Sequence, residues 1–230
     1  RHYESSTFRA IYTEVFTSVA YIGFNTVSEQ RLAENIFGRR MSPHGLISVG
    51  INVVADADWV DVKRKYNLPE EYLLYVGRID KGKLNHIVQY FLHYKARYVN
   101  SKLKFVLVGG LFSAPVSHSD LIYTGFVSEN EKYAIIRHAK IMVNPSKFES
   151  LSLILLEGMQ LGKPMLVNGK CEVLKEHCSK SEKAALAYWN KNDFISKLAS
   201  LETSSELCRE MGKKGKVYVE TYYSWSVIME

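Results

Sequence analysis

Short apolar runs alternate with amphipathic segments over most of the chain, beginning at about residue 72. The first run, residues 72–76, has the length of a strand and ends at Gly77, where the chain can turn. Four further runs are predicted as strands: residues 104–108, 121–123, 141–143 and 165–167. The predicted helices are 84–97, one that begins after Ser128, 153–161, 171–178, 192–200 and 205–220. Strands with little polar alternation, separated by such helices, predict a doubly wound α/β domain with a parallel sheet.

The first fifty residues hold too few elements to form a domain. Residues 20–24 and 46–49 look like strands, and residues 29–37 look like a helix, with Thr26 and Glu29 at capping-box spacing. Two strands and one helix cannot bury a sheet by themselves. We therefore predict three parts: residues 1–51 as the C-terminal part of an upstream domain, 52–71 as a hinge, and 72–215 as the main domain.

Composition and charge narrow the class of protein only slightly. Apolar residues form 47% of the chain and charged residues 23%, as in ordinary globular domains, which argues against disorder or a fibrous protein. A net charge of +6 would suit a nucleic acid, an anionic membrane surface or a phosphorylated small molecule. The basic residues are scattered and the aromatic residues fall at core positions, so nucleic-acid binding is not predicted. A peripheral contact with an anionic membrane stays open.

The chain has no apolar run of the roughly 20 residues that span a bilayer, and its start does not resemble a signal peptide. We therefore expect a cytoplasmic protein. The cysteines Cys171, Cys178 and Cys208 are odd in number and lack the spacing of a zinc site. Reduced, mostly buried thiols are the simpler interpretation.

Two glutamates eight residues apart, Glu149 and Glu157, bracket the start of the predicted helix 153–161. The N–H groups of residues 151–153 would lie unpaired in its first turn, where the helix dipole also favours an anion. Arg78 and Lys83 follow the first strand of the same sheet and could supply the cations. Ligands bind at the carboxyl ends of such strands, so we predict one cleft there. Any of these residues alone would more often be a surface charge.

In this order the motifs resemble the C-terminal domain of glycosyltransferase family 4. The pair Glu149 and Glu157 is the specific part of the pattern, whereas the Gly-Gly and Asn-Gly pairs are weak. The other segments that carry the resemblance are 77–83, 108–110, 125–128, 161–164 and 167–169. Residues 24–29 and 49–52 look like the end of that family's N-terminal domain and its hinge. Residues 223–226 look like its closing helix, which we assign to 216–230.

The resemblance implies a Rossmann-like donor domain of a two-domain GT-B enzyme. Such an enzyme transfers a hexosyl group from a nucleotide-diphosphate sugar, with retention, to a saccharide or lipid-linked acceptor, as in polysaccharide biosynthesis. It implies neither a metal nor a cofactor. Arg78 and Lys83 would hold the pyrophosphate, Glu149 the transferred sugar and Glu157 the ribose. The other donor-binding residues that it implies are Gly77, Gly109, Gly110, Gly125, Phe126, Val127, Ser150, Leu151, Ser152 and Leu153.

The chain departs from the family pattern in three places. Ser150 and Ser152 stand where many relatives have glycine, and Lys81 competes with Lys83 for the lysine position. The glycine-rich loop and the acceptor-side histidine of the upstream domain have no counterpart. We therefore expect that the chain needs the missing N-terminal domain or a partner chain for turnover. Two alternatives are a nucleotide-sugar epimerase of the same fold and a non-catalytic or split-partner nucleotide-sugar-binding subunit.

Overall fold

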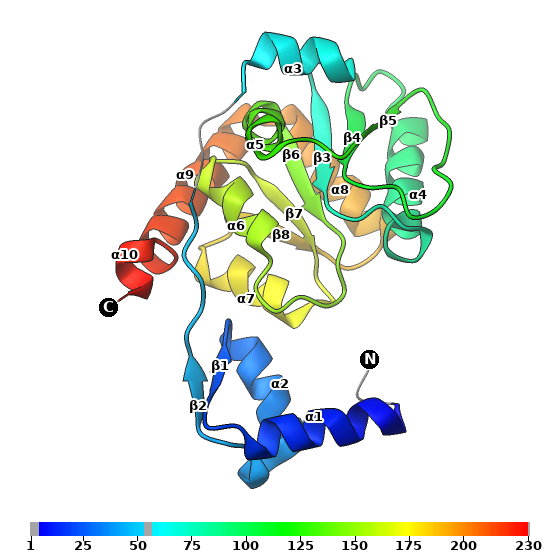
Figure 1. The fold of residues 1–230 in the computed structure, drawn as a ribbon. Helices are drawn as coiled ribbons and strands as arrows, with labels where there is room; N and C mark the ends of the chain where they lie inside the picture. Colours follow the sequence, from blue (N-terminus) through cyan, green and yellow to red (C-terminus); the bar gives the residue numbers. More distant parts are fainter. Residues whose placement is uncertain (1–4, 53–56, 230) are drawn as a thin grey trace.

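The computed structural model describes residues 5–52 and 57–229, without the side chains of Arg39, Lys83 and Asn85. A large parallel sheet with helices on both faces forms the main body, and a smaller α/β segment lies below it (Figure 1). The predicted fold class, a doubly wound α/β domain joined to part of another domain, is confirmed.

All six strands of the main sheet run parallel, in the order β5-β4-β3-β6-β7-β8. In chain order the sheet grows outwards from β3 through β4 and β5, and the chain then returns to place β6 on the other side of β3. This reversal leaves a crevice at the carboxyl ends of β3 and β6. The strands are β3 (Tyr72–Val76), β4 (Lys104–Val108), β5 (Leu121–Gly125), β6 (Ile141–Asn144), β7 (Met165–Asn168) and β8 (Ala185–Tyr188). The five predicted strands are confirmed, and the edge strand β8 was not predicted.

Alternate residues of the strands pack against different helix layers, which explains the continuous apolar runs. Leu73 and Tyr75 pack against α4 (Lys81–Arg97) and α8 (Lys191–Thr203). Tyr72 and Leu74 belong to the core on the other face. That core includes residues of α3 (Trp59–Tyr66), α5 (Glu129–His138), α6 (Leu153–Gln160), α7 (Glu172–Lys180) and α9 (Ser205–Tyr222).

The upstream segment comprises α1 (Ser6–Ser18), β1 (Ile22–Phe24), α2 (Val27–Phe37), the short 3-10 helix η2 (Gly38–Arg40) and β2 (His44–Leu46), with β1 and β2 parallel. The second strand lies two residues before its predicted position, and α1 was not predicted. Thr26 caps α2 by accepting from the Glu29 N–H at 3.2 Å. The Glu29 carboxylate accepts from the Asn25 N–H instead of the cap residue, so only half of the expected capping box forms. The box of Ser128 and Glu131 on α5 is complete.

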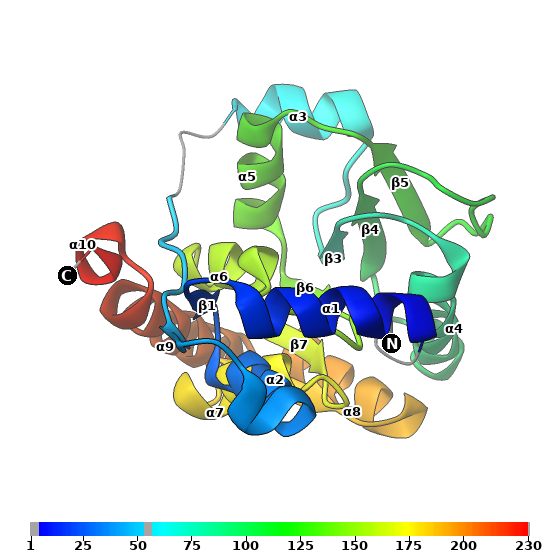
Figure 2. The same cartoon turned by 60° about the horizontal axis from the view of Figure 1, so that its bottom comes forward.

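The upstream segment contacts the main body in several places. Helix α2 lies against α7, which Figure 2 shows from below. Residues 50 and 51 contact the C-terminal part of the chain. The Ile51 N–H donates to the Tyr223 carbonyl at 2.8 Å, and the Trp225 ring of α10 (Trp225–Ile228) packs on Gly50. The segment predicted as a hinge, residues 52–71, contains α3, which was not predicted.

No helix in the described ranges is both long and apolar enough to cross a bilayer.

Candidate functional site

A pocket of about 470 Å³ opens at the carboxyl ends of β3, β4 and β5. The predicted donor-binding residues that line it are Gly77, Arg78, Gly109, Gly110, Phe126 and Val127. Phe112, Glu129 and Lys132 also line the pocket and were not predicted. The topology brings these residues together because neighbouring parallel strands release their loops at one edge of the sheet.

The glycines of the pocket allow two loops to approach each other. Gly109 has a φ of 137°, and a Cβ at this position would lie 2.1 Å from the Gly77 carbonyl oxygen. A side chain would therefore push the ends of β3 and β4 apart. Gly125 has a φ of 72° and accepts a hydrogen bond from the Gly109 N–H at 2.9 Å. The Gly-Gly pair is a weak signal in the sequence, but the close approach of the two loops explains why its first residue, Gly109, is a glycine.

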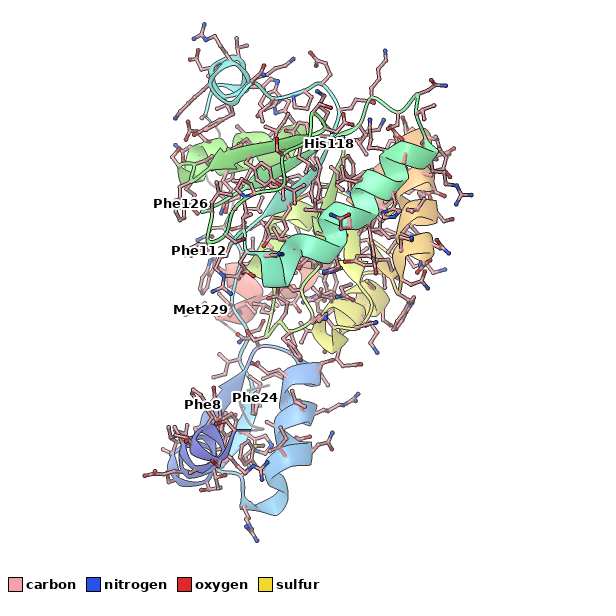
Figure 3. The ribbon with its side chains drawn as sticks, turned by 90° about the vertical axis from the view of Figure 1, so that its right-hand side faces the viewer. Phe8, Phe24, Phe112, His118, Phe126 and Met229 are labelled. Carbon is pink, nitrogen blue, oxygen red and sulfur yellow. The ribbon has the colours of Figure 1, made fainter. Side chains whose placement is uncertain are left out.

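Two exposed phenylalanines stand at one edge of the pocket (Figure 3). Phe112 is 65% exposed and Phe126 is 80% exposed, so both rings are open to a ligand. The Arg78 guanidinium lies 5.9 Å from the centre of the Phe112 ring, and its Nε donates to Asp80 at 2.9 Å. This edge therefore combines aromatic faces with a guanidinium that is 65% exposed.

Glu157 lies in the first turns of α6, where its carboxylate accepts hydrogen bonds from two side chains of α5. The Lys132 Nζ lies 2.9 Å and the Tyr133 hydroxyl 3.1 Å from Oε1 of Glu157. Lys132 is also part of the pocket, so Glu157 is linked to the pocket through this ion pair. Lys132 was not predicted as a site residue from the sequence, because its i,i+3 spacing from Glu129 is typical of an ordinary ion pair on a helix surface.

Glu149 lies in the β6–α6 loop, residues 145–152, on the other side of the crevice. Asn144, the last residue of β6, donates from Nδ2 to Glu149 at 3.3 Å and to the Ser152 hydroxyl at 2.8 Å. Its Oδ1 accepts from the Ser146 N–H at 2.9 Å. Asn168, at the end of β7, donates to the Pro145 carbonyl at 3.0 Å. Two buried asparagines at adjacent strand ends therefore hold this loop.

Ser152 adopts a left-handed conformation, with a φ of 70°, directly before α6. Ser152 is one of the two positions where the family pattern described above has glycine. The hydrogen bond from Asn144 compensates part of the strain of this backbone conformation. In the described part of the chain, no acceptor is recorded for the N–H groups of Leu151, Ser152 and Leu153. These donors, at a helix N-terminus, form the anion-binding geometry that the spacing of the motif predicted.

The buried Tyr75 side chain contacts the loop that follows β3. Its hydroxyl donates to the Arg78 carbonyl at 2.9 Å. Burial raises the pKa of Tyr75, and the charges of Asp80 and Glu149 raise it further. The Tyr75 hydroxyl group is therefore neutral at pH 7. The side chain of Lys83 lies outside the part of the chain that the structure describes.

Beneath the β6–α6 loop, His177 of α7 is fully buried. Its Nε2 lies 2.8 Å from the Leu151 carbonyl oxygen and its Nδ1 lies 2.9 Å from the Tyr218 hydroxyl. Burial lowers the pKa of His177 to about 4, so the ring is neutral at pH 7. A neutral ring has one donor and one acceptor, and the Leu151 carbonyl can only accept. The Nε2 proton therefore points to Leu151, and Nδ1 accepts from Tyr218.

Within residues 5–52 and 57–229, no group of three or more histidine, cysteine, aspartate or glutamate side chains is arranged to hold a metal ion. The expectation that the site works without a metal stays a prediction.

The buried His177 predicts a specific loss of stability at low pH. The unfolded chain binds a proton on this histidine near pH 6.5, whereas the folded chain binds it only near pH 4. Stability should therefore fall as the pH drops through this window, and the loss should be complete below about pH 4. Between pH 7 and pH 5 the histidine should cost about 2 kcal/mol of unfolding free energy.

Urea unfolding at both pH values tests this, with His177→Gln as the control that retains a donor but cannot titrate. The variant should lose less stability than the wild type over the same interval. Equal losses would show that His177 does not titrate differently on folding.

Several solved structures have a similar fold. Sucrose-phosphate synthase from Thermosynechococcus elongatus superimposes with a TM-score of 0.77 at 17% identity, over 98% of this chain and 62% of that chain. WaaG, a glycosyltransferase involved in lipopolysaccharide biosynthesis, gives 0.74 at 14% identity, over 99% and 67%. A variant of S. aureus TarM in complex with fondaparinux, α-GlcNAc-glycerol and UDP gives 0.77 at 14% identity, over 97% and 45%.

At these identities the superpositions show the fold, which is that of the GT-B proteins. The chain spans less than two thirds of the synthase, so the activity of the whole protein is a matter for proposal. The glycosyl transferases group 1 family matches residues 60–218, which is more than half of the chain and includes both sides of the crevice. This chain therefore belongs to the glycosyl transferases group 1 family.

Proposed function

We propose that the crevice binds a nucleotide-diphosphate sugar and that the protein transfers its hexosyl group to a saccharide or lipid-linked saccharide acceptor. The observation that carries the proposal is the pairing of two features across the reversal of strand order. One is the pocket with Arg78 and the exposed phenylalanines. The other is the β6–α6 loop, whose N–H groups at residues 151–153 have no acceptor among the described residues. A nucleoside diphosphate placed between these two features would bring its flat base to the phenylalanines and its anionic phosphates to the loop N–H groups.

The proposal gives each predicted residue a role, which the resemblance suggests and the position of the described residues supports. Phe126, Val127 and the newly found Phe112 would contact the base, and Glu157 with Lys132 would contact the ribose. Arg78 would leave Asp80 to reach the phosphates, because an exposed ion pair contributes little to stability. Glu149 would accept hydrogen bonds from the transferred sugar. Lys83 is proposed as the second phosphate ligand on the motif alone.

We propose retention of anomeric configuration, within glycosyltransferase family 4. In that reaction the bond from C1 of the sugar to the leaving phosphate breaks, and a bond to the acceptor oxygen forms on the same face. The acceptor proton passes to the leaving phosphate oxygen. Arg78, Lys83 and the backbone N–H groups of Leu151, Ser152 and Leu153 would stabilise the charge on that phosphate without a metal.

The base is the first specificity to establish, and UDP is the first candidate because the TarM variant was solved with it. Binding in GT-B proteins of this kind also places the acceptor against an upstream domain. We propose that residues 5–52 belong to such a domain.

Arg78→Ala should weaken binding of the preferred nucleoside diphosphate about tenfold to a hundredfold, because a hydrogen bond to a charged group contributes about 1.5–3 kcal/mol. A thermal-shift screen with UDP, GDP, ADP and CMP, with and without their sugars and without added metal, identifies the preferred nucleotide, and calorimetry then compares the variants. Arg97→Ala removes an exposed arginine at the opposite end of α4 and should bind like the wild type. Equal affinities for Arg78→Ala and Arg97→Ala would remove Arg78 from the site.

Substitutions of the two glutamates, Glu149 and Glu157, should weaken the binding of different ligands. Glu157→Ala should weaken binding of the free nucleoside diphosphate, because its role is on the ribose. Glu149→Ala should weaken only the nucleotide sugar, because its role is on the hexose. Calorimetric titration of both variants with the diphosphate and with its sugar form measures the difference. If both variants lose the free diphosphate to the same extent, the division of roles is wrong.

A further inference from the structure

The two peptide groups at the turn before α6 are both held by side chains from elsewhere in the fold. The Thr26 hydroxyl donates to the Ser150 carbonyl at 3.0 Å, and His177 Nε2 donates to the Leu151 carbonyl at 2.8 Å. Thr26 belongs to the upstream segment and His177 to α7, so two parts distant in sequence meet on consecutive residues of one loop. All three of Thr26, Leu151 and His177 are buried.

A trans peptide group is planar, with its C=O and the following N–H pointing in opposite directions. The carbonyls of Ser150 and Leu151 share their peptide planes with the N–H groups of Leu151 and Ser152. Holding each carbonyl on the protein side therefore turns the matching N–H to the opposite side. These N–H groups are among those for which the described residues supply no acceptor.

We infer that Thr26 and His177 are positioning residues that aim the N–H groups of Leu151 and Ser152 at the diphosphate of the donor. Neither side chain is assigned a contact with the ligand. The inference rests on the proposed function and gives Thr26 and His177 a role that the resemblance did not imply.

The surroundings of His177 keep its ring in one orientation. Tyr218 donates to Nδ1, and the Tyr223 hydroxyl lies 3.3 Å from the Tyr218 hydroxyl. The Tyr223 carbonyl also accepts the N–H of Ile51, in the connection between the two parts of the chain. The charges of Glu176 and Lys180, on the same helix, act on the ring: Glu176 raises its pKa and Lys180 lowers it. The hydrogen bond to Leu151 therefore ends a chain of contacts that begins at the connection.

The surroundings of Thr26 place the upstream segment against the same helix. Ser28 donates its N–H to Glu176 at 2.7 Å, so a carboxylate of α7 occupies the N-terminus of α2. Glu176 also forms an ion pair with Lys180. Adjacent residues of α7 thus have different partners: Glu176 binds the upstream segment and His177 binds the β6–α6 loop. Docking of α2 and the direction of the loop N–H groups are therefore linked.

The test compares UDP with uridine, which has no phosphate, in the full chain. His177→Phe keeps a ring but removes both hydrogen bonds, and Thr26→Val keeps the shape but removes the hydroxyl. Each should weaken UDP binding about threefold to tenfold, the range expected for one lost hydrogen bond, and change uridine binding less than about twofold. Calorimetry measures UDP, and competition in ligand-observed NMR measures uridine.

Three further variants separate positioning from stability. His177→Gln and Thr26→Ser restore a donor and should return UDP binding to within about twofold of the wild type. Ser204→Ala removes the cap of α9, which accepts from the Leu207 N–H at 3.2 Å as Thr26 accepts from Glu29. This control should lower the melting temperature and leave both affinities unchanged.

Unchanged UDP affinity in His177→Phe and Thr26→Val would overturn the inference and leave the proposed function standing. An equal loss of UDP and uridine would also overturn it, since the residues would then support the whole pocket and not the phosphate turn. A wild type that binds none of the diphosphates in the nucleotide screen would overturn the proposed function and this inference together.

Discussion

The reversal of strand order between β3 and β6 is the constraint on which the site depends. β3 pairs with β4 on one side and with β6 on the other, so the loops after β3 and β6 leave the sheet towards opposite faces. The space between them receives the pocket residues from one side and the β6–α6 loop from the other. Packing of both faces against helices keeps the strands in place, because each strand buries alternate residues in a different core.

Short side chains at the strand ends turn this general geometry into a particular site. Gly109 allows the ends of β3 and β4 to approach, and Asn144 and Asn168 hydrogen-bond the loop that follows them. The left-handed Ser152 then starts α6, and the described residues supply no acceptor for the first N–H groups of the helix. Since the asparagines and His177 bind the loop from the protein side, the ligand side keeps its donors. Under the proposed function, this arrangement would organise the turn before the donor arrives and so reduce the entropy cost of binding.

Much of this architecture could be predicted from the sequence, because buried parallel strands appear as continuous apolar runs. Residues 72–76 and 104–108 are of this kind and were placed correctly. The strand Ala185–Tyr188 was missed because it is short, lies at the sheet edge and is only half buried. Helix α3 was missed because Val62 is its only buried residue among many charged ones. The helix α1 has aromatic residues at helical spacing, Phe8, Tyr12 and Phe16, a signal that was present and not used.

The candidate site also contains some residues that could be predicted from the sequence and others that could not. Motif residues such as Arg78, Gly109 and Phe126 were predicted because each belongs to a short segment after a strand that carries the family resemblance, and the structure brings them to one pocket. Their roles as donor ligands stay predictions. Thr26 and His177 contact the β6–α6 loop from positions more than twenty residues away, and no local pattern encodes such contacts. Long-range hydrogen bonds of this kind depend on the packing of α2 and α7, which only the folded structure supplies.

The most direct test of the central claim follows the backbone amides of the β6–α6 loop by ¹⁵N NMR during titration with UDP and, separately, with uridine. The account predicts that UDP shifts the amide signals of Leu151, Ser152 and Leu153 along with those of Phe126 and Val127. Uridine should shift only the second pair. Shifts that leave residues 151–153 unchanged with UDP would contradict the claim that this turn binds the diphosphate.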